Sequence, residues 1–180
     1  MGSRSNNKKK IGEHSGKEVS PKQFALAIAW RVLIIYLIVI IVFLILLHTV
    51  WGVYIVKGSS MEPTLSNNEL FITNWKTENL QRFDIVIICL PNENIVKRVV
   101  GLPGETVQIV DGCLTINGEV IKDVTSITMT YAGIAAEPIT LGEGEYFVLG
   151  DNREHSSDSR DPRIGIIQHE WIIGKVIWHY

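Results

Sequence analysis

The segment TVQIVDGCLTINGEVI (residues 106–121) predicts two consecutive β-hairpins. Its short apolar runs are separated by Asp111-Gly112 and Asn117-Gly118, dipeptides that supply the positive φ angles of two-residue hairpin turns. Similar runs continue on both sides: LFIT, DIVIICL, NIVKRVVG, EYFVLG and IIGKVIW. Residues 51–180 are therefore predicted to form a mainly β domain of coiled antiparallel sheets, or a small β-barrel-like structure.

Upstream of this domain lies an uncharged apolar run, VLIIYLIVIIVFLILL (residues 32–47). Because about 20 apolar residues cross a bilayer as a helix, residues 24–50 are predicted to form one transmembrane helix, a signal anchor. A cleavable signal peptide is the competing interpretation, but the run is too long and no small-x-small site follows it. A buried globular helix is disfavoured because apolar residues occupy every face.

Charge is distributed unevenly along the 180 residues: residues 1–31 have a net charge of +5 and the remainder −7. The polar residues 1–23 are expected to be a disordered basic tail. The positive-inside rule places this tail in the cytoplasm and the β domain on the outer side of the cell membrane, with Trp51 and Tyr54 at the outer interface. The acidic balance of the domain argues against nucleic acid as a partner.

Neither a metal nor a cofactor is predicted. The two cysteines and five histidines lack ligand spacing, and no glycine-rich phosphate loop is present. Cys89 and Cys113 could form a disulfide outside the cell, but the sequence does not require one. Cys89 lies in an apolar run and is expected to be a buried strand residue.

Lys97 is flanked by apolar residues in NIVKRVVG, so strict alternation places it and Arg98 on opposite faces of a strand. The pattern alone favours an edge strand from which both charges reach water, because buried lysine is rare. The alternative is a desolvated Lys97 whose lowered pKa leaves a neutral amine, able to take the proton of a serine hydroxyl. Ser60, in the loop VKGSSMEPTL (residues 56–65), is a candidate for that serine.

A histidine base is a rival to Lys97. A Ser-His-Asp set could be drawn from Ser60, His155 and either Asp158 or Asp161. The simpler interpretation of His155, among charged neighbours, is a solvated loop histidine.

Five segments, in this order after one apolar span, resemble the signature segments of bacterial type I signal peptidases: SSMEPTL, RFDIVII, VKRVVGLPGE, LGDNREHSSDSR and RIGIIQHEWIIGKV. The similarity covers most of the chain from about Lys57 onward, except residues 107 to about 141. Several spaced segments in order are far more specific than one motif.

The resemblance implies a Ser-Lys dyad, with Ser60 as nucleophile and Lys97 as general base. Ser156 resembles the hydroxyl that hydrogen-bonds the lysine amine and orients it. Four further residues resemble supporting ionic groups: Asp158, Arg160, Asp151 and Arg98. The oxyanion would be stabilised in part by the backbone N–H of Ser60.

Three positions depart from the pattern. In some members the position of Gly58 holds a serine whose hydroxyl adds to the oxyanion hole. Other members have glycine there, as this chain does. The sequence does not identify the group that completes the hole in this chain. Phe83 stands where a glycine is usual, and Gln168 where a proline is common.

The resemblance implies a membrane-bound serine endopeptidase that removes N-terminal signal peptides from secretory preproteins, cutting after small-x-small sequences. Its partners would be those preproteins and the lipid bilayer. Two alternatives share the fold: a membrane-anchored binding module without turnover, and a dedicated protease with a single substrate.

Overall fold

The computed structural model describes residues 21–122, 124–125 and 128–179, and their side chains except those of residues 27 and 46–50. Most of the expected basic tail, residues 1–20, lies outside the described residues. The chain divides into two compact units, Met1–Ile45 and Leu46–Tyr180, which are described separately.

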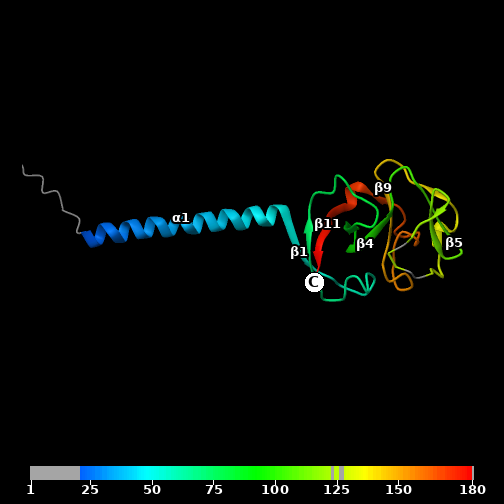
Figure 1. The fold of residues 1–180 in the computed structure, drawn as a ribbon, viewed down its shortest axis with the longest axis horizontal. Helices are drawn as coiled ribbons and strands as arrows, with labels where there is room; N and C mark the ends of the chain where they lie inside the picture. Colours follow the sequence, from blue (N-terminus) through cyan, green and yellow to red (C-terminus); the bar gives the residue numbers. More distant parts are fainter. Residues whose placement is uncertain (1–20, 123, 126–127, 180) are drawn as a thin grey trace, which may run out of the picture. The chain divides into compact units, whose positions relative to one another are not determined.

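One long helix, α1 (Pro21–Val50), precedes the β domain (Figure 1). Residues Pro21–Ile45 are long and apolar enough to cross a membrane, and an 18-residue window within them has a mean hydropathy of 3.0. Apolar side chains such as Phe24, Leu33 and Val42 are exposed all around this part of the helix. Such a surface is suited to lipid rather than to water.

The strands of the described residues form two antiparallel sheets, which confirms the predicted fold class. The larger sheet has the order β1-β2-β11-β3-β4-β9-β10 and the smaller has the order β7-β6-β5-β8. The strands have the following bounds: β1 Trp51–Ile55, β2 Leu70–Asn74, β3 Ile85–Cys89, β4 Asn94–Gly101, β5 Thr106–Val110, β6 Cys113–Ile116, β7 Glu119–Val120, β8 Ile139–Thr140, β9 Glu145–Leu149, β10 Ile167–Gln168 and β11 Ile172–His179. Two short 3-10 helices complete the domain, η1 Gly133–Ala136 and η2 His169–Trp171.

The two predicted hairpins are confirmed in the smaller sheet. Val110 pairs with Cys113 across the first turn, and Ile116 pairs with Glu119 across the second. All four turn residues have positive φ, at 50° and 73° in Asp111-Gly112 and 53° and 83° in Asn117-Gly118. Both φ angles of each turn are therefore positive, as a type I′ turn requires.

The edge position expected for the strand of Lys97 is wrong. β4 lies between β3 and β9, so it is paired on both sides. Lys97 is 3% exposed and Arg98 is 8% exposed. Alternation along a central strand turns one of these cations toward each face of the sheet, and each must find a partner inside the domain.

One expectation about a single residue is corrected. Cys89 is exposed, because it ends β3 where the chain leaves the sheet, and it and Cys113 are free thiols. Tyr54 is half-buried and stacks its ring on Phe71 with centroids 5.7 Å apart, and its place at a membrane interface stays a prediction. Trp51 is exposed on β1.

Candidate active site

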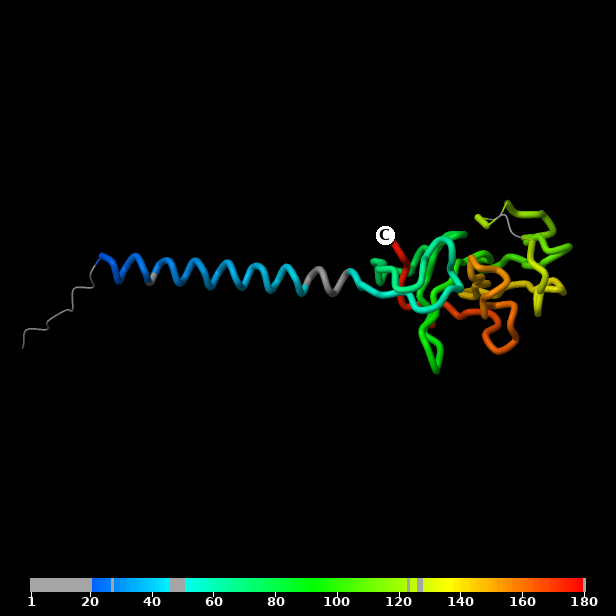
Figure 2. Tube along the Cα trace, turned by 90° about the horizontal axis from the view of Figure 1, so that it is seen from below, coloured from blue at the N-terminus to red at the C-terminus, as the bar shows by residue number. Residues whose placement is uncertain are grey.

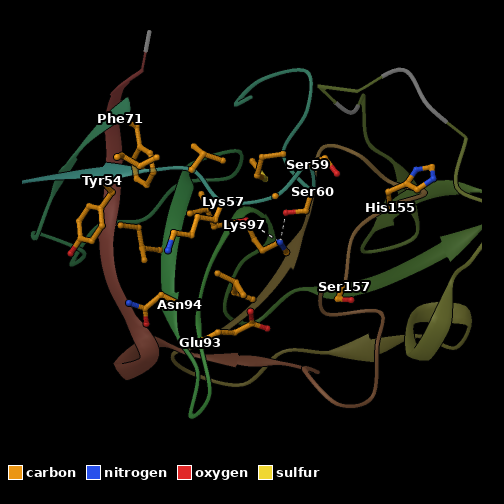
Figure 3. Close-up of a pocket in the computed structure, with 17 residues that line it drawn as sticks. Tyr54, Lys57, Ser59, Ser60, Phe71, Glu93, Asn94, Lys97, His155 and Ser157 are labelled. Carbon is orange, nitrogen blue, oxygen red and sulfur yellow. Dashed lines mark hydrogen bonds between the residues drawn. The ribbon is translucent and has the colours of Figure 1, made fainter. Parts of the chain in front are cut away.

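Ser60 lies in the loop between β1 and β2, which a hydrophobic cluster anchors. Met61, the next residue, is 1% exposed and packs with Val56, Leu65 and Phe71. Burial of a side chain on each side of Ser60 fixes the loop while the serine itself faces a groove (Figure 3).

The side chains of Ser60 and Lys97 meet in this groove. Lys97 Nζ donates to Ser60 Oγ at 2.8 Å and to the carbonyl oxygen of Val96 at 3.1 Å (Figure 3). The two residues are 37 positions apart in the chain, and β4 brings the amine to the serine from the interior of the larger sheet. A hydroxyl within hydrogen-bond reach of an amine is the geometry of an activated nucleophile.

The environment of the amine favours its neutral form. Burial lowers the pKa of Lys97 to about 8 from an ordinary value of 10.5. The nearby carboxylates act in the opposite direction, and each raises the pKa: Asp158, Glu93 and Asp151. Desolvation prevails because no carboxylate makes an ion pair with the amine among the described residues.

Two buried ion pairs surround the serine and the lysine. Arg98 Nε and Nη2 donate to both carboxylate oxygens of Asp151, at 2.8 and 2.5 Å, so the cation on the other face of β4 is fully paired. Arg160 Nε and Nη2 bind the two oxygens of Asp158 at 2.8 and 2.9 Å. The Gly150 N–H donates to Asp158 at 3.0 Å. The four residues expected to form ionic pairs are thus brought together.

Ser156 does not form the expected contact with Lys97 in this structure. Its Oγ is buried and has no hydrogen-bond partner among the described residues. It lies against Gly150, where an added β carbon would collide with Ser156 Oγ and lie 2.5 Å from the carbonyl oxygen of Ser60. Ser156 Oγ therefore lies near the carbonyl oxygen of Ser60 without hydrogen-bonding the Lys97 amine.

The geometry does not assemble a histidine triad. His155 is exposed, and its Nδ1 lies 3.3 Å from Asn152 Oδ1. Asp158 is engaged by Arg160, and Asp161 by Arg163. His155 lines the same groove as Ser60, but the side chain that hydrogen-bonds Ser60 Oγ is that of Lys97.

The groove has a volume of about 670 Å³ and both apolar and polar walls. Met61, Phe71 and Ile87 contribute apolar surface beside Ser60. The turn between β3 and β4 contributes Glu93, and Figure 2 shows this hairpin (green) extending from the domain. Among the described residues, no group of three or more His, Cys, Asp or Glu is arranged to hold a metal ion.

Gly58 leaves the groove without a hydroxyl at that position. Its φ is +94°, and its N–H donates to Asn67 Oδ1 at 2.9 Å. Glycine adopts this φ freely, whereas a serine there would be strained.

The other two departures have structural counterparts. Phe83 has a φ of +74°, which gives a physical reason for the glycine that is usual at this position. Gln168 uses its side chain, with Nε2 donating to Glu145 Oε1 at 3.1 Å.

Asn152 is a contact residue that the sequence did not single out. Its side-chain Nδ2 donates to the carbonyl oxygen of Ser59 at 3.1 Å, and its backbone N–H donates to that of Ser60 at 3.0 Å. Its place inside LGDNREHSSDSR was the available signal, but nothing in one sequence separates it from its polar neighbours.

Comparison with known proteins shows which family this chain matches. Residues 28–180 match the family described as signal peptidase, peptidase S26. The chain is 39% identical over 152 residues to signal peptidase I T of Bacillus subtilis (strain 168), covering 76% of this chain and 77% of that protein. It is 33% identical over 147 residues to signal peptidase IB of Staphylococcus aureus (strain N315), covering 71% and 76%.

A crystal structure of a signal peptidase I from Enterococcus faecalis V583 is also similar, with 34% identity, 57% of this chain and 100% of that chain covered, and a TM-score of 0.47. The sequence matches confirm the resemblance carried by the five segments. A match that spans residues 28–180 includes most of α1 and the whole β domain, and the chain therefore belongs to the signal peptidase family, peptidase S26.

Proposed function

We propose that this chain is a membrane-bound serine endopeptidase that removes signal peptides from secretory preproteins, with Ser60 as nucleophile and Lys97 as general base. The observation that carries the proposal is the 2.8 Å contact between Lys97 Nζ and Ser60 Oγ in an accessible groove. A buried lysine whose pKa is lowered to about 8 supplies a neutral amine near neutral pH.

The chemistry follows from this contact. The neutral amine of Lys97 takes the hydroxyl proton of Ser60, and Ser60 Oγ bonds to the scissile carbonyl carbon. The protonated amine then returns the proton to the leaving nitrogen, which departs and leaves an acyl-enzyme. The same amine activates a water molecule that hydrolyses the ester and regenerates Ser60.

The groove supports a preference for small side chains before the scissile bond. Met61, Phe71 and Ile87 form apolar walls beside Ser60, and each is 2% exposed or less. A rigid apolar wall excludes larger groups, at a cost of about 1–3 kcal/mol per methylene. Cutting after small-x-small sequences, as the family resemblance implies, is consistent with such walls.

The membrane anchor supports a substrate that is itself held in the bilayer. The chain passes from α1 to Ser60 within ten residues, so at about 3.3 Å per residue Ser60 lies within roughly 35 Å of the end of the helix. Sharing one membrane raises the local concentration of a preprotein that carries an apolar segment. Seven Lys/Arg in residues 1–31 favour a cytoplasmic N-terminus and an extracytoplasmic β domain.

The test is cleavage of a purified preprotein by the detergent-solubilised full chain, with the cut site sequenced. Ser60→Ala and Lys97→Ala should each lower the rate by more than about 1000-fold. Ser66→Ala, which alters an exposed serine of the same loop outside the groove, is the matched control and should retain the wild-type rate.

Four outcomes would contradict parts of this proposal. Full activity of Ser60→Ala or Lys97→Ala would show that the dyad is wrongly assigned. A loss in His155→Ala as large as that in Ser60→Ala would favour a histidine base. Refusal of diverse preproteins together with cleavage of one protein would indicate a dedicated protease, and no cleavage at all would indicate a binding module.

A further inference from the structure

We propose that Asn152 is a positioning residue that orients the peptide between Ser59 and Ser60, so that the Ser60 N–H faces the oxygen of the reacting carbonyl group. The inference rests on the proposed function, because it concerns how the Ser60 site stabilises the charge that develops during attack. It also addresses the hydroxyl that Gly58 does not supply.

Asn152 binds two consecutive carbonyl groups in the loop between β1 and β2 that carries Ser60. Its side-chain Nδ2 reaches the oxygen of Ser59 at 3.1 Å, and its backbone N–H reaches the oxygen of Ser60 at 3.0 Å. The approach is possible because Gly150 has no β carbon, since one placed there would lie 2.5 Å from the Ser60 oxygen. One residue therefore fixes the peptide planes before and after the Ser60 side chain.

The bond to Ser59 determines where the Ser60 N–H points. A peptide unit is planar, and in the trans form its C=O and N–H point in opposite directions. The Ser59–Ser60 peptide is not cis, so holding its oxygen toward Asn152 directs its N–H away from Asn152. Among the described residues, no acceptor is hydrogen-bonded to the Ser60 N–H, which leaves it available to an incoming oxygen.

The orientation of the Asn152 amide is determined by its partners. The Ser59 carbonyl can only accept, so the NH2 group must face it and Oδ1 must face the other way. On that side lies His155 Nδ1, at 3.3 Å. This contact is long and exposed, so the hydrogen bond from Asn152 to the Ser59 carbonyl oxygen does not depend on His155.

Asp151, the residue before Asn152, connects the segment after β9 to the strand that carries Lys97. Asp151 binds Arg98, which adjoins Lys97 on β4. Asp151 and Asn152, which follow β9, thus contact β4 beside Lys97 and the loop that carries Ser60. Together they fix the positions of Ser60 and Lys97 relative to each other. Loss of the side-chain bond at Asn152 should therefore affect the orientation of Ser60 more than the folding of the domain.

The test compares two isosteric Asn→Asp variants of the full chain in detergent. Asn152→Asp cannot donate to Ser59, but keeps the backbone bond to Ser60. Asn67→Asp places the same charge on the same loop and still accepts the Gly58 N–H, so it is the matched control. Because an added carboxylate can shift the pKa of Lys97, kcat is compared on its high-pH plateau.

We expect Asn152→Asp to lower the plateau kcat by about 30-fold, less than the roughly 100-fold to 1000-fold loss of a whole oxyanion donor, with KM within about twofold of wild type. Asn67→Asp should remain within about twofold in both constants, and both variants should unfold at the wild-type temperature. Asn152→Ala, which removes the donor without adding charge, should behave as Asn152→Asp does.

A peptide aldehyde with small residues at its first and third positions reports on the oxyanion directly. Ser60 Oγ bonds to the aldehyde carbon, the hydroxyl proton passes to Lys97, and the former carbonyl oxygen carries the negative charge. Its affinity should fall in Asn152→Asp by the same factor as kcat. The corresponding peptide amide, which makes no such bond, should bind unchanged.

Wild-type kcat in Asn152→Asp, or an equal loss of affinity for aldehyde and amide, would overturn the positioning role. Failure of both Asn152 variants to fold would also overturn it, in favour of a structural role. Failure of the proposed function is distinguished by Ser60→Ala: an active Ser60→Ala enzyme refutes the dyad, whereas an inactive one beside a fully active Asn152→Asp refutes only this inference.

Discussion

Lys97 is the residue whose ionisation should control the rate. Only the neutral amine can accept the proton of Ser60, and burial lowers its pKa to about 8. As the pH falls below 8, the neutral fraction decreases roughly tenfold per unit, so kcat/KM at pH 6 should be about 1% of its plateau. A pH profile of preprotein cleavage measures this limb. A flat profile between pH 6 and 9 would contradict a lysine base.

Glu93 should influence the position of that limb. Its carboxylate is exposed at the rim of the groove, and its charge raises the pKa of Lys97. Glu93→Gln should therefore move the limb to lower pH and increase kcat/KM at pH 7, with an unchanged plateau. The shift should diminish at about 1 M salt, because screening weakens interactions between exposed charges.

Glu119→Gln is the control for Glu93→Gln, since it removes an exposed carboxylate from β7 in the smaller sheet. Its pH profile should coincide with that of the wild type. A limb that stays in place in Glu93→Gln would mean that this carboxylate does not contribute to the pKa of Lys97.

At the scale of the strands, Phe83 introduces β3 in a conformation that costs free energy. Its φ of +74° lies in the left-handed region, yet its N–H donates to Val99 at 2.7 Å and its carbonyl accepts from Arg98 at 2.7 Å. The backbone is thus held in place by β4, next to Lys97. Any non-glycine residue at this position is strained, by about 1 kcal/mol.

Phe83→Gly and Phe83→Ala separate this strain from the side-chain packing. Both remove the ring, but only glycine relieves the strained φ. The free energy of unfolding should therefore be about 1 kcal/mol higher for Phe83→Gly than for Phe83→Ala. Denaturant unfolding of the two variants in the same detergent measures the difference, and equal stability would contradict a strained backbone at Phe83.

The hairpins of the smaller sheet could be predicted from the sequence because their information is local. Asp111-Gly112 and Asn117-Gly118 specify their own turns and need no distant partner. The two-residue strands β8 and β10 could not be predicted, because they exist only through pairing with β5 and β9. β1 could not be predicted because its apolar residues directly continue the apolar sequence of the helix.

At the scale of the whole molecule, the order of strands determines what the pattern around Lys97 could not. Local alternation placed Lys97 and Arg98 on opposite faces, but the choice between an edge and a central strand depends on β3 and β9. The contact of Arg98 with Asp151 joins residues 53 positions apart. The five family segments include Ser60 and Lys97, whose side chains the structure brings together, whereas the carbonyl contacts of Asn152 required the three-dimensional structure.

The topology of the whole chain can be tested with its own two cysteines. Cys89 and Cys113 are exposed free thiols in the β domain, and the sequence contains no other cysteine. If the N-terminus is cytoplasmic and the β domain lies outside, a membrane-impermeant maleimide should label the protein in intact cells. The Cys89→Ser/Cys113→Ser double variant should not be labelled, and adding Ser5→Cys to it should give labelling only after lysis. Labelling of the native protein only after lysis would place the β domain, and with it Ser60, on the cytoplasmic side, where a preprotein would not yet have crossed the membrane.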